Sequence, residues 1–196
     1  MGIIKTFSPS SNSVISIWKI EESINELRDI SKQITDIKNE IKEMEYHASR
    51  EALKNGCKKL GIDFIGIEKD SNGKPNLKNN CAEISISHKF PYAVVMIHKE
   101  RACGLDIERI DKKVLKIKDK FLNHDEADYI GESVKNATIY WAIKEALYKI
   151  EGEPVAFKNI IIKRSTSKNQ FECRVNRKNY TIEVDELDKH IIAYTN

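Results

Sequence analysis

The spacing of hydrophobic positions changes along the chain. Over residues 21–60, apolar residues recur at alternating steps of three and four, the spacing of one helix face. Ser23 and Glu26 form a potential capping box at the start, and Gly56 and Gly61 bracket the end. The stripe predicts one long helix or two helices packed on a sheet, with a coiled coil as the alternative. Its members are Leu27, Ile30, Ile34, Ile37, Ile41, Met44 and Ala48.

A period of two replaces the helical period further along. Residues 82–87 alternate apolar and polar side chains, which predicts a half-buried strand. The β-branched run at 92–97 predicts its antiparallel partner, and residues 103–108 predict a third strand. The turn before them, residues 70–75, contains Asn-Gly, which favours positive φ, and ends at Pro75.

The second half of the chain repeats the order of helix and then strands. Asn123 and Glu126 predict the start of a short helix that ends near Ile130, and a stronger helix is expected over 137–150. Strand patterns return at residues 160–162, 171–175, 180–184 and 191–194. The sequence therefore predicts an α+β protein of two similar halves, 1–100 and 101–196, each with a helix packed on a small antiparallel sheet.

Composition and charge narrow the class of protein. Of 196 residues, 40% are hydrophobic and 32% charged, which is typical of a soluble protein. No stretch reaches the roughly 20 apolar residues of a membrane span, and the N-terminus lacks the pattern of a secretory signal. The four cysteines are widely separated, as in reduced cytoplasmic proteins. The net charge of +3 is evenly spread, which argues against a nucleic-acid-binding tail.

Five residues are candidates for chemistry. Asp106 and Glu108 lie two apart on an expected strand, so both carboxylates point to one face. Trp141, Glu145 and Lys149 follow at steps of four, along one stripe of the expected helix. Taken alone, such residues are usually solvated surface charges. A shared metal site is the alternative.

Together these two segments resemble a known family. Residues 104–108 (GLDIE) and 141–149 (WAIKEALYK) are similar to the two signature motifs of the 4′-phosphopantetheinyl transferase superfamily. Further segments resemble the family from about Trp18 to Ile160. They are Gly73-Lys74-Pro75, Ile84-Ser85-Ile86-Ser87-His88, Glu45-Tyr46-His47-Ala48-Ser49-Arg50, and Lys120-Phe121-Leu122 with Glu126.

The resemblance implies both a fold and a reaction. Two α+β halves in 196 residues resemble the long, monomeric type in trimmed form, with the halves related by a pseudo-twofold axis. The implied reaction is the Mg²⁺-dependent transfer of 4′-phosphopantetheine from coenzyme A to a serine of an apo acyl or peptidyl carrier protein. It releases 3′,5′-ADP, as a holo-[acyl-carrier-protein] synthase does, and would serve fatty-acid or secondary-metabolite biosynthesis.

The resemblance also implies roles for individual residues. Asp106, Glu108 and Glu145 would bind Mg²⁺, or alternatively Mn²⁺, and either Glu145 or Lys149 would be the catalytic base. The implied coenzyme A contacts are Arg50, Lys74, Pro75, Ser87, His88 and Lys144. The implied carrier-protein docking residues are Lys112, Lys113, Lys116, Lys120 and Phe121. Basic side chains in that segment suit an acidic carrier protein.

Two departures and two alternatives accompany this interpretation. Lys89 stands where the family has a small polar residue, and Leu105 replaces the usual β-branched residue. One alternative is a non-catalytic interaction protein that pairs through a coiled coil over 27–48. The other is a Mg²⁺-dependent nucleotide hydrolase built on the same carboxylates. We expect a cytoplasmic monomer that binds coenzyme A and a carrier protein, but neither nucleic acid nor a membrane.

Overall fold

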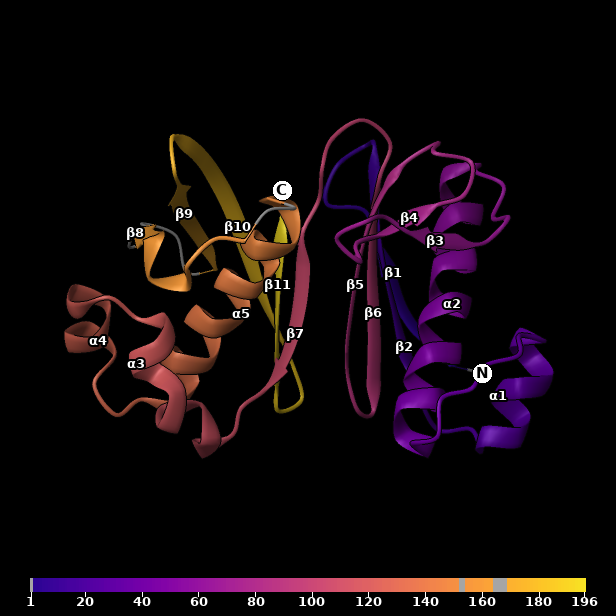
Figure 1. The fold of residues 1–196 in the computed structure, drawn as a ribbon, viewed down its shortest axis with the longest axis horizontal. Helices are drawn as coiled ribbons and strands as arrows, with labels where there is room; N and C mark the ends of the chain where they lie inside the picture. Colours follow the sequence, from indigo (N-terminus) through magenta and orange to yellow (C-terminus); the bar gives the residue numbers. More distant parts are fainter. Residues whose placement is uncertain (1, 152–153, 164–168) are drawn as a thin grey trace. The chain divides into compact units, whose positions relative to one another are not determined.

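The computed structural model describes residues 2–151, 154–163 and 169–196 (Figure 1). The chain divides into two compact units, Met1–Cys103 and Gly104–Asn196. Each unit has its own sheet and its own hydrophobic core. Over the described ranges, no helix combines the length and hydropathy needed to cross a membrane.

The N-terminal unit is a four-stranded antiparallel sheet in the order β1-β2-β6-β5. Two helices accompany the sheet, and the longer one, α2, packs on β2 and β6. A separate two-stranded ribbon, β3-β4, precedes β5. The bounds are β1 Ile3–Phe7, β2 Ser13–Lys19, α1 Ile24–Ser31, α2 Glu40–Leu60, β3 Ile67–Lys69, β4 Pro75–Leu77, β5 Glu83–Lys89 and β6 Tyr92–His98.

The two helices of this unit do not form one continuous stripe. Helix α1 ends at Lys32, which adopts the left-handed conformation (φ 52°) and breaks the helical path. Leu27 is fully buried, whereas Ile34 in the following non-helical segment is 99% exposed. Helix α2 starts anew with the Asn39 side chain accepting a bond from the Lys42 amide. Of the two forms that the pattern left open, one long helix or two helices, the structure has two, and the coiled-coil alternative over 27–48 is wrong.

Strands β1 and β2 were not predicted from the pattern. Strand β2 lies between β1 and β6, so both of its edges are paired. Its sequence, SVISIWK, is rich in β-branched and aromatic residues, which is the available signal for a strand buried on both faces.

The C-terminal unit is a five-stranded antiparallel sheet in the order β7-β11-β10-β9-β8. Helix α5 packs on β7 and β11. The expected basic linker over 109–120 contains a 3₁₀ turn and a short helix. The bounds are β7 Leu105–Arg109, η1 Lys112–Ile117, α3 Lys118–Phe121, α4 His124–Ile130, α5 Val134–Glu151, η2 Phe157–Asn159, β8 Ile160–Lys163, β9 Gln170–Val175, β10 Lys178–Leu187 and β11 His190–Thr195.

The two units share a plan of connection. In each, the strand that precedes the helices pairs with the last strand of the unit: β2 with β6, and β7 with β11. The last strand also pairs with the strand just before it, β5 or β10. The long helix then packs on the first pair. The structure thus confirms an α+β fold with antiparallel sheets of similar size.

The broken stripe yields a matched pair of substitutions. Leu27→Ala should lower the free energy of unfolding by about 2–5 kcal/mol, because it empties a buried site. Ile34→Ala should change it by less than about 0.5 kcal/mol, because that side chain is in solvent. Urea unfolding of both variants measures the difference. Equal losses would mean that the apolar stripe is buried along its whole length.

Candidate active site

Helix α5 and strand β7 approach each other very closely at Gly104. A Cβ atom built on Gly104 would lie 2.1 Å from the carbonyl oxygen of Ala146 and 2.6 Å from Ile150. The first contact is with backbone, which cannot move aside as a side chain can, so only glycine fits here. The Gly104 N–H in turn donates to the Thr195 hydroxyl at 3.2 Å. The glycine of the first motif therefore permits the close approach of α5 to this strand. Figure 1 shows α5 beside β7.

Both motif carboxylates on β7 face this helix. Asp106 is paired in register with Ala193 and Glu108 with Ile191 on β11. Both partners belong to the core on which α5 packs. Side chains two apart on a strand share a face. Asp106 and Glu108 therefore lie on one face of β7, and that face is the one that α5 covers.

Two side chains of α5 bond these carboxylates. The Lys149 ammonium donates to Asp106 Oδ1 at 2.8 Å and to the Leu105 carbonyl at 2.9 Å. The Trp141 indole N–H donates to Glu108 Oε1 at 3.2 Å. The α5 side chains predicted to form one stripe therefore contact the two carboxylates predicted to share one face of β7.

Within the Asp106–Lys149 pair, the carboxylate is shielded from water and the ammonium is partly exposed. The exposed fraction is 6% for the Asp106 side chain and 27% for Lys149. A carboxylate this buried is stable only with a positive partner or several hydrogen bonds. Breaking the pair by removing the ammonium would leave that charge uncompensated.

The third carboxylate, Glu145, lies between Trp141 and Lys149 on the same helix and is partly exposed. Within the residues that the structure describes, no three side chains of His, Cys, Asp or Glu are grouped as a metal site. The three carboxylates are therefore not preassembled around a cation, although their hard oxygen donors are those that Mg²⁺ prefers. Metal binding by Asp106, Glu108 and Glu145 stays a prediction.

Lys144 corrects one of the predicted coenzyme contacts. Its side chain is fully buried, and its ammonium donates to Glu126 at 2.6 Å, the Phe121 carbonyl at 2.9 Å and the Phe157 carbonyl at 3.0 Å. Burial lowers the pKa of Lys144, and the bond to Glu126 opposes that shift. All three N–H groups are used inside the protein, so Lys144 does not line a binding surface.

Glu126 completes this internal network. One of its oxygens also accepts the Asn123 amide at 3.1 Å, and the other accepts the Ile162 amide at 3.1 Å. Lys144 and Glu126 together join α3, α4, α5, η2 and β8. The sequence placed Glu126 in a family segment and in a helix cap, but it gave no sign of this pairing.

Phe121 corrects one of the predicted docking residues. It is fully buried, and its ring lies 4.9 Å from that of Trp141. The lysines predicted with it, Lys112, Lys113, Lys116 and Lys120, are all exposed. They form a basic surface on η1 and α3, which we call the basic segment.

Arg50 lies in the N-terminal unit on α2. Its Nη1 donates to the Tyr46 carbonyl at 3.2 Å and the Ser49 hydroxyl at 3.0 Å, and the guanidinium stacks on the Tyr46 ring at 3.4 Å. Burial lowers the pKa of Arg50. No carboxylate among the described residues is within ion-pair distance of it. A half-buried guanidinium without an acid beside it is suited to an anionic ligand.

His88, at the end of β5, bonds an acid of α2. Its Nδ1 lies 2.9 Å from Glu45 Oε2, and Glu45 Oε1 accepts the Phe90 amide at 3.0 Å. His88 is about half exposed, whereas Glu45 is buried. Glu45 belongs to a segment that resembles the family, but its sequence alone gave it no role. Ser87 immediately before His88 is buried.

Lys74 and Pro75 follow a tight turn. Asp70 Oδ1 accepts the amides of Asn72 and Lys74, both at 2.9 Å, and Gly73 takes positive φ (82°), as the Asn-Gly pair predicts. The Lys74 ammonium lies 3.3 Å from Glu83 of β5. Pro75 begins β4.

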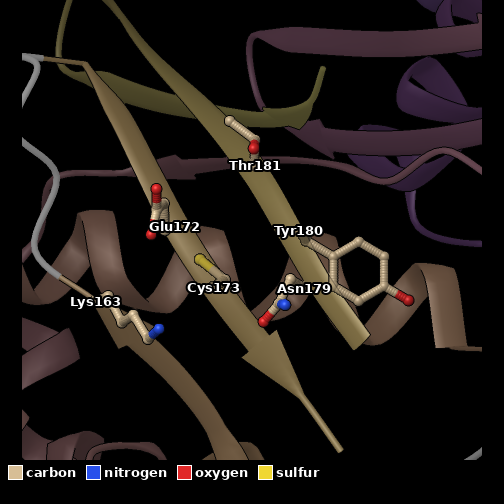
Figure 2. Close-up of a pocket in the computed structure, with 6 residues that line it drawn as sticks. All are labelled: Lys163, Glu172, Cys173, Asn179, Tyr180 and Thr181. Atoms are coloured by element: carbon tan, nitrogen blue, oxygen red, sulfur yellow. The ribbon is translucent and has the colours of Figure 1, made fainter. Parts of the chain in front are cut away.

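A cavity of about 260 Å³ lies elsewhere, on the β8-β9-β10 part of the sheet (Figure 2). None of the predicted site residues lines it. Figure 2 shows the Tyr180 ring directed away from Lys163, Glu172 and Thr181. The lining residues are Lys163, Glu172, Cys173, Asn179, Tyr180 and Thr181.

The buried pair makes a stability test. Lys144→Met should lower the free energy of unfolding by about 3–5 kcal/mol, because Glu126 loses its buried counter-charge. Lys118→Met is the control: its partner Glu132 is 80% exposed, so the loss should stay under about 1 kcal/mol. Denaturant unfolding compares the two. The double variant Lys144→Met/Glu126→Gln should recover part of the loss, and a harmless Lys144→Met would contradict the assignment.

Comparison with known families agrees with the motifs. Residues 102–195 match the family model of the 4′-phosphopantetheinyl transferase superfamily. No curated protein matches the chain. The match spans both signature motifs and nearly the whole C-terminal unit. This match confirms the family recognised from the sequence over residues 102–195 and supports a transferase.

Proposed function

We propose that the protein transfers the 4′-phosphopantetheine arm of coenzyme A to a serine of an apo acyl or peptidyl carrier protein. The superfamily match supports a phosphopantetheine transferase. The observation that carries the proposal is the contact of the two motifs, in which Lys149 of α5 bonds Asp106 of β7. The serine oxygen bonds to the phosphorus of the arm, the bond from that phosphorus to the 3′,5′-ADP oxygen breaks, and 3′,5′-ADP leaves.

Such an attack requires the negative charge of the pyrophosphate to be neutralised. Asp106, Glu108 and Glu145 would hold Mg²⁺, and the ion would supply that neutralisation. The indole of Trp141 holds Glu108, and the ammonium of Lys149 holds Asp106. These two bonds fix the β7 carboxylates before any ligand arrives.

The contacts of Lys149 favour one of its two predicted roles. Its nitrogen donates to a carboxylate and to a carbonyl at once, so it already acts as a hydrogen-bond donor in the site. We assign it to binding a phosphate oxygen. Glu145, a partly exposed carboxylate on the same stripe, then takes the serine proton.

The coenzyme contacts remain those of the N-terminal unit. We propose that Arg50 and His88 bind phosphate groups, and that Ser87, Lys74 and Pro75 contact the coenzyme beside them. Arg50 is supported by its stacked, half-buried guanidinium. Lys144 is excluded because it is buried within the C-terminal unit.

The basic segment is proposed as the docking surface for the carrier protein. Carrier proteins of this family are acidic around the modified serine, and Lys112, Lys113, Lys116 and Lys120 are exposed cations. Charges of this kind mainly raise the rate of encounter and set orientation. Phe121 is buried in the core that supports this segment, so it does not contact the carrier protein directly.

Intact-mass spectrometry tests the activity. Incubation with coenzyme A, Mg²⁺ and a panel of apo carrier proteins should add the roughly 340 Da arm to at least one of them. Asp106→Asn and Lys149→Met should each lower the rate by about 100-fold or more, because each removes charge control at the reacting phosphate. Circular dichroism checks that both variants fold, and Lys135→Met is the matched control, since its partner Glu186 is exposed.

Two results of this assay would contradict the proposal. The first is the absence of the added mass in every carrier protein. The second is release of nucleotide from coenzyme A at the same rate with and without a carrier protein, which would favour the hydrolase alternative. Omission of Mg²⁺ tests the metal requirement in the same mixture.

Charge reversal tests docking. The double variant Lys112→Glu/Lys113→Glu should raise the KM for the carrier protein by about tenfold and leave the KM for coenzyme A unchanged, because it reverses a surface charge. Lys58→Glu/Lys59→Glu, an exposed basic pair at the end of α2, is the control. The difference in KM for the carrier protein between the two double variants should become smaller at high salt. Equal effects of the two double variants would place docking elsewhere.

A further inference from the structure

We infer that Glu45 is a positioning residue that holds the His88 imidazole in the orientation needed to bind a phosphate group of coenzyme A. The inference rests on the proposed function. It adds a residue that neither the motifs nor the superfamily match assigned to the site.

The first support is geometric. Glu45 Oε2 lies 2.9 Å from His88 Nδ1, and Glu45 Oε1 accepts the Phe90 amide at 3.0 Å. The carboxylate is therefore anchored to the backbone next to β5 and to the ring at the same time. Because Nδ1 donates to Glu45, Nε2 on the other side of the ring is the nitrogen left for a ligand, and it must carry a proton to donate to a phosphate oxygen.

The second support is the difference in burial. The Glu45 side chain is 10% exposed and the His88 side chain 46% exposed. A buried acid that bonds a half-exposed imidazole restricts the ring while leaving one edge open to solvent. Outer carboxylates orient the histidines that bind metals in the same way. The difference is that a metal takes a lone pair of the outer nitrogen, whereas a phosphate oxygen needs an N–H on it.

The third support is the charge state of Glu45. Burial alone would raise its pKa, but the His88 bond, with further help from the Phe90 amide and the nearby Lys89 charge, makes the net shift a lowering. Glu45 is therefore ionised at neutral pH. The stability that it contributes is present above the ordinary carboxyl pKa and is lost as the pH falls through the lowered value.

The fourth support is the position of Arg50. Glu45 and Arg50 lie five residues apart on α2, and α2 packs against β5, which carries His88. Arg50 has no carboxylate beside it within the described part of the chain, and it is held by Tyr46 and Ser49. One helix thus carries both the acid that orients the imidazole and the guanidinium proposed to bind the coenzyme.

The test compares conservative variants. Glu45→Gln should raise the KM for coenzyme A by about tenfold and change kcat by less than about twofold. Glu51→Gln is the matched control on the same helix, where Glu51 pairs with Lys54 at 2.5 Å, and it should change neither constant. With coenzyme A bound, imidazole ¹⁵N shifts should show protons on both nitrogens of His88 in the wild type and a smaller doubly protonated fraction in Glu45→Gln.

A double-mutant cycle separates positioning from simple support of the fold. If Glu45 acts through His88, Glu45→Gln should have no further effect on the KM for coenzyme A in a His88→Ala background. The same tenfold increase in that background would overturn the inference, as would an unchanged KM in Glu45→Gln alone. A wild-type protein that neither binds coenzyme A nor transfers its arm would instead refute the proposed function, and the inference with it.

Discussion

The ion pair between Lys149 and Asp106 is the contact on which the rest of the C-terminal unit depends. It places a carboxylate with 6% exposure next to a cation from another element, so β7 and α5 must meet at a fixed distance. Gly104 allows that distance because no Cβ fits beneath the Ala146 carbonyl. The packing of α5 on β7 therefore builds the core and also brings Lys149 to Asp106. Gly104 and Asp106, both in the first motif, contribute to each of these.

Two other buried acids, Glu126 and Glu45, also hold a basic side chain in place, and the result differs with the exposure of that side chain. Glu126 holds the fully buried Lys144, and the pair joins α3, α4, α5, η2 and β8, which is a contribution to folding. Glu45 holds the half-exposed His88, which leaves one edge of the imidazole for a ligand. The second motif contains two lysines five residues apart. Burial separates them: Lys144 is internal, and Lys149, at 27% exposure, remains accessible.

The local spacing of apolar residues predicted the helices and strands that bury a single face. Helices α4 and α5, strands β5 to β7, and the shared face of Asp106 and Glu108 all follow from spacing. The break at Lys32 did not, because apolar residues continue at helical spacing into a segment where Ile34 faces solvent. The burial of Lys144 and Phe121 did not either, since their partners come from elsewhere in the unit and leave no local signal.

The most direct test of the account is a single-turnover measurement with stoichiometric apo carrier protein, in which 3′,5′-ADP and holo carrier protein are quantified together. The wild type should form one 3′,5′-ADP for each holo carrier protein, and Lys149→Met should form neither product on that time scale. Nucleotide release that exceeds holo carrier protein, or full turnover by Lys149→Met, would contradict the assignment of the β7–α5 contact as the transfer site.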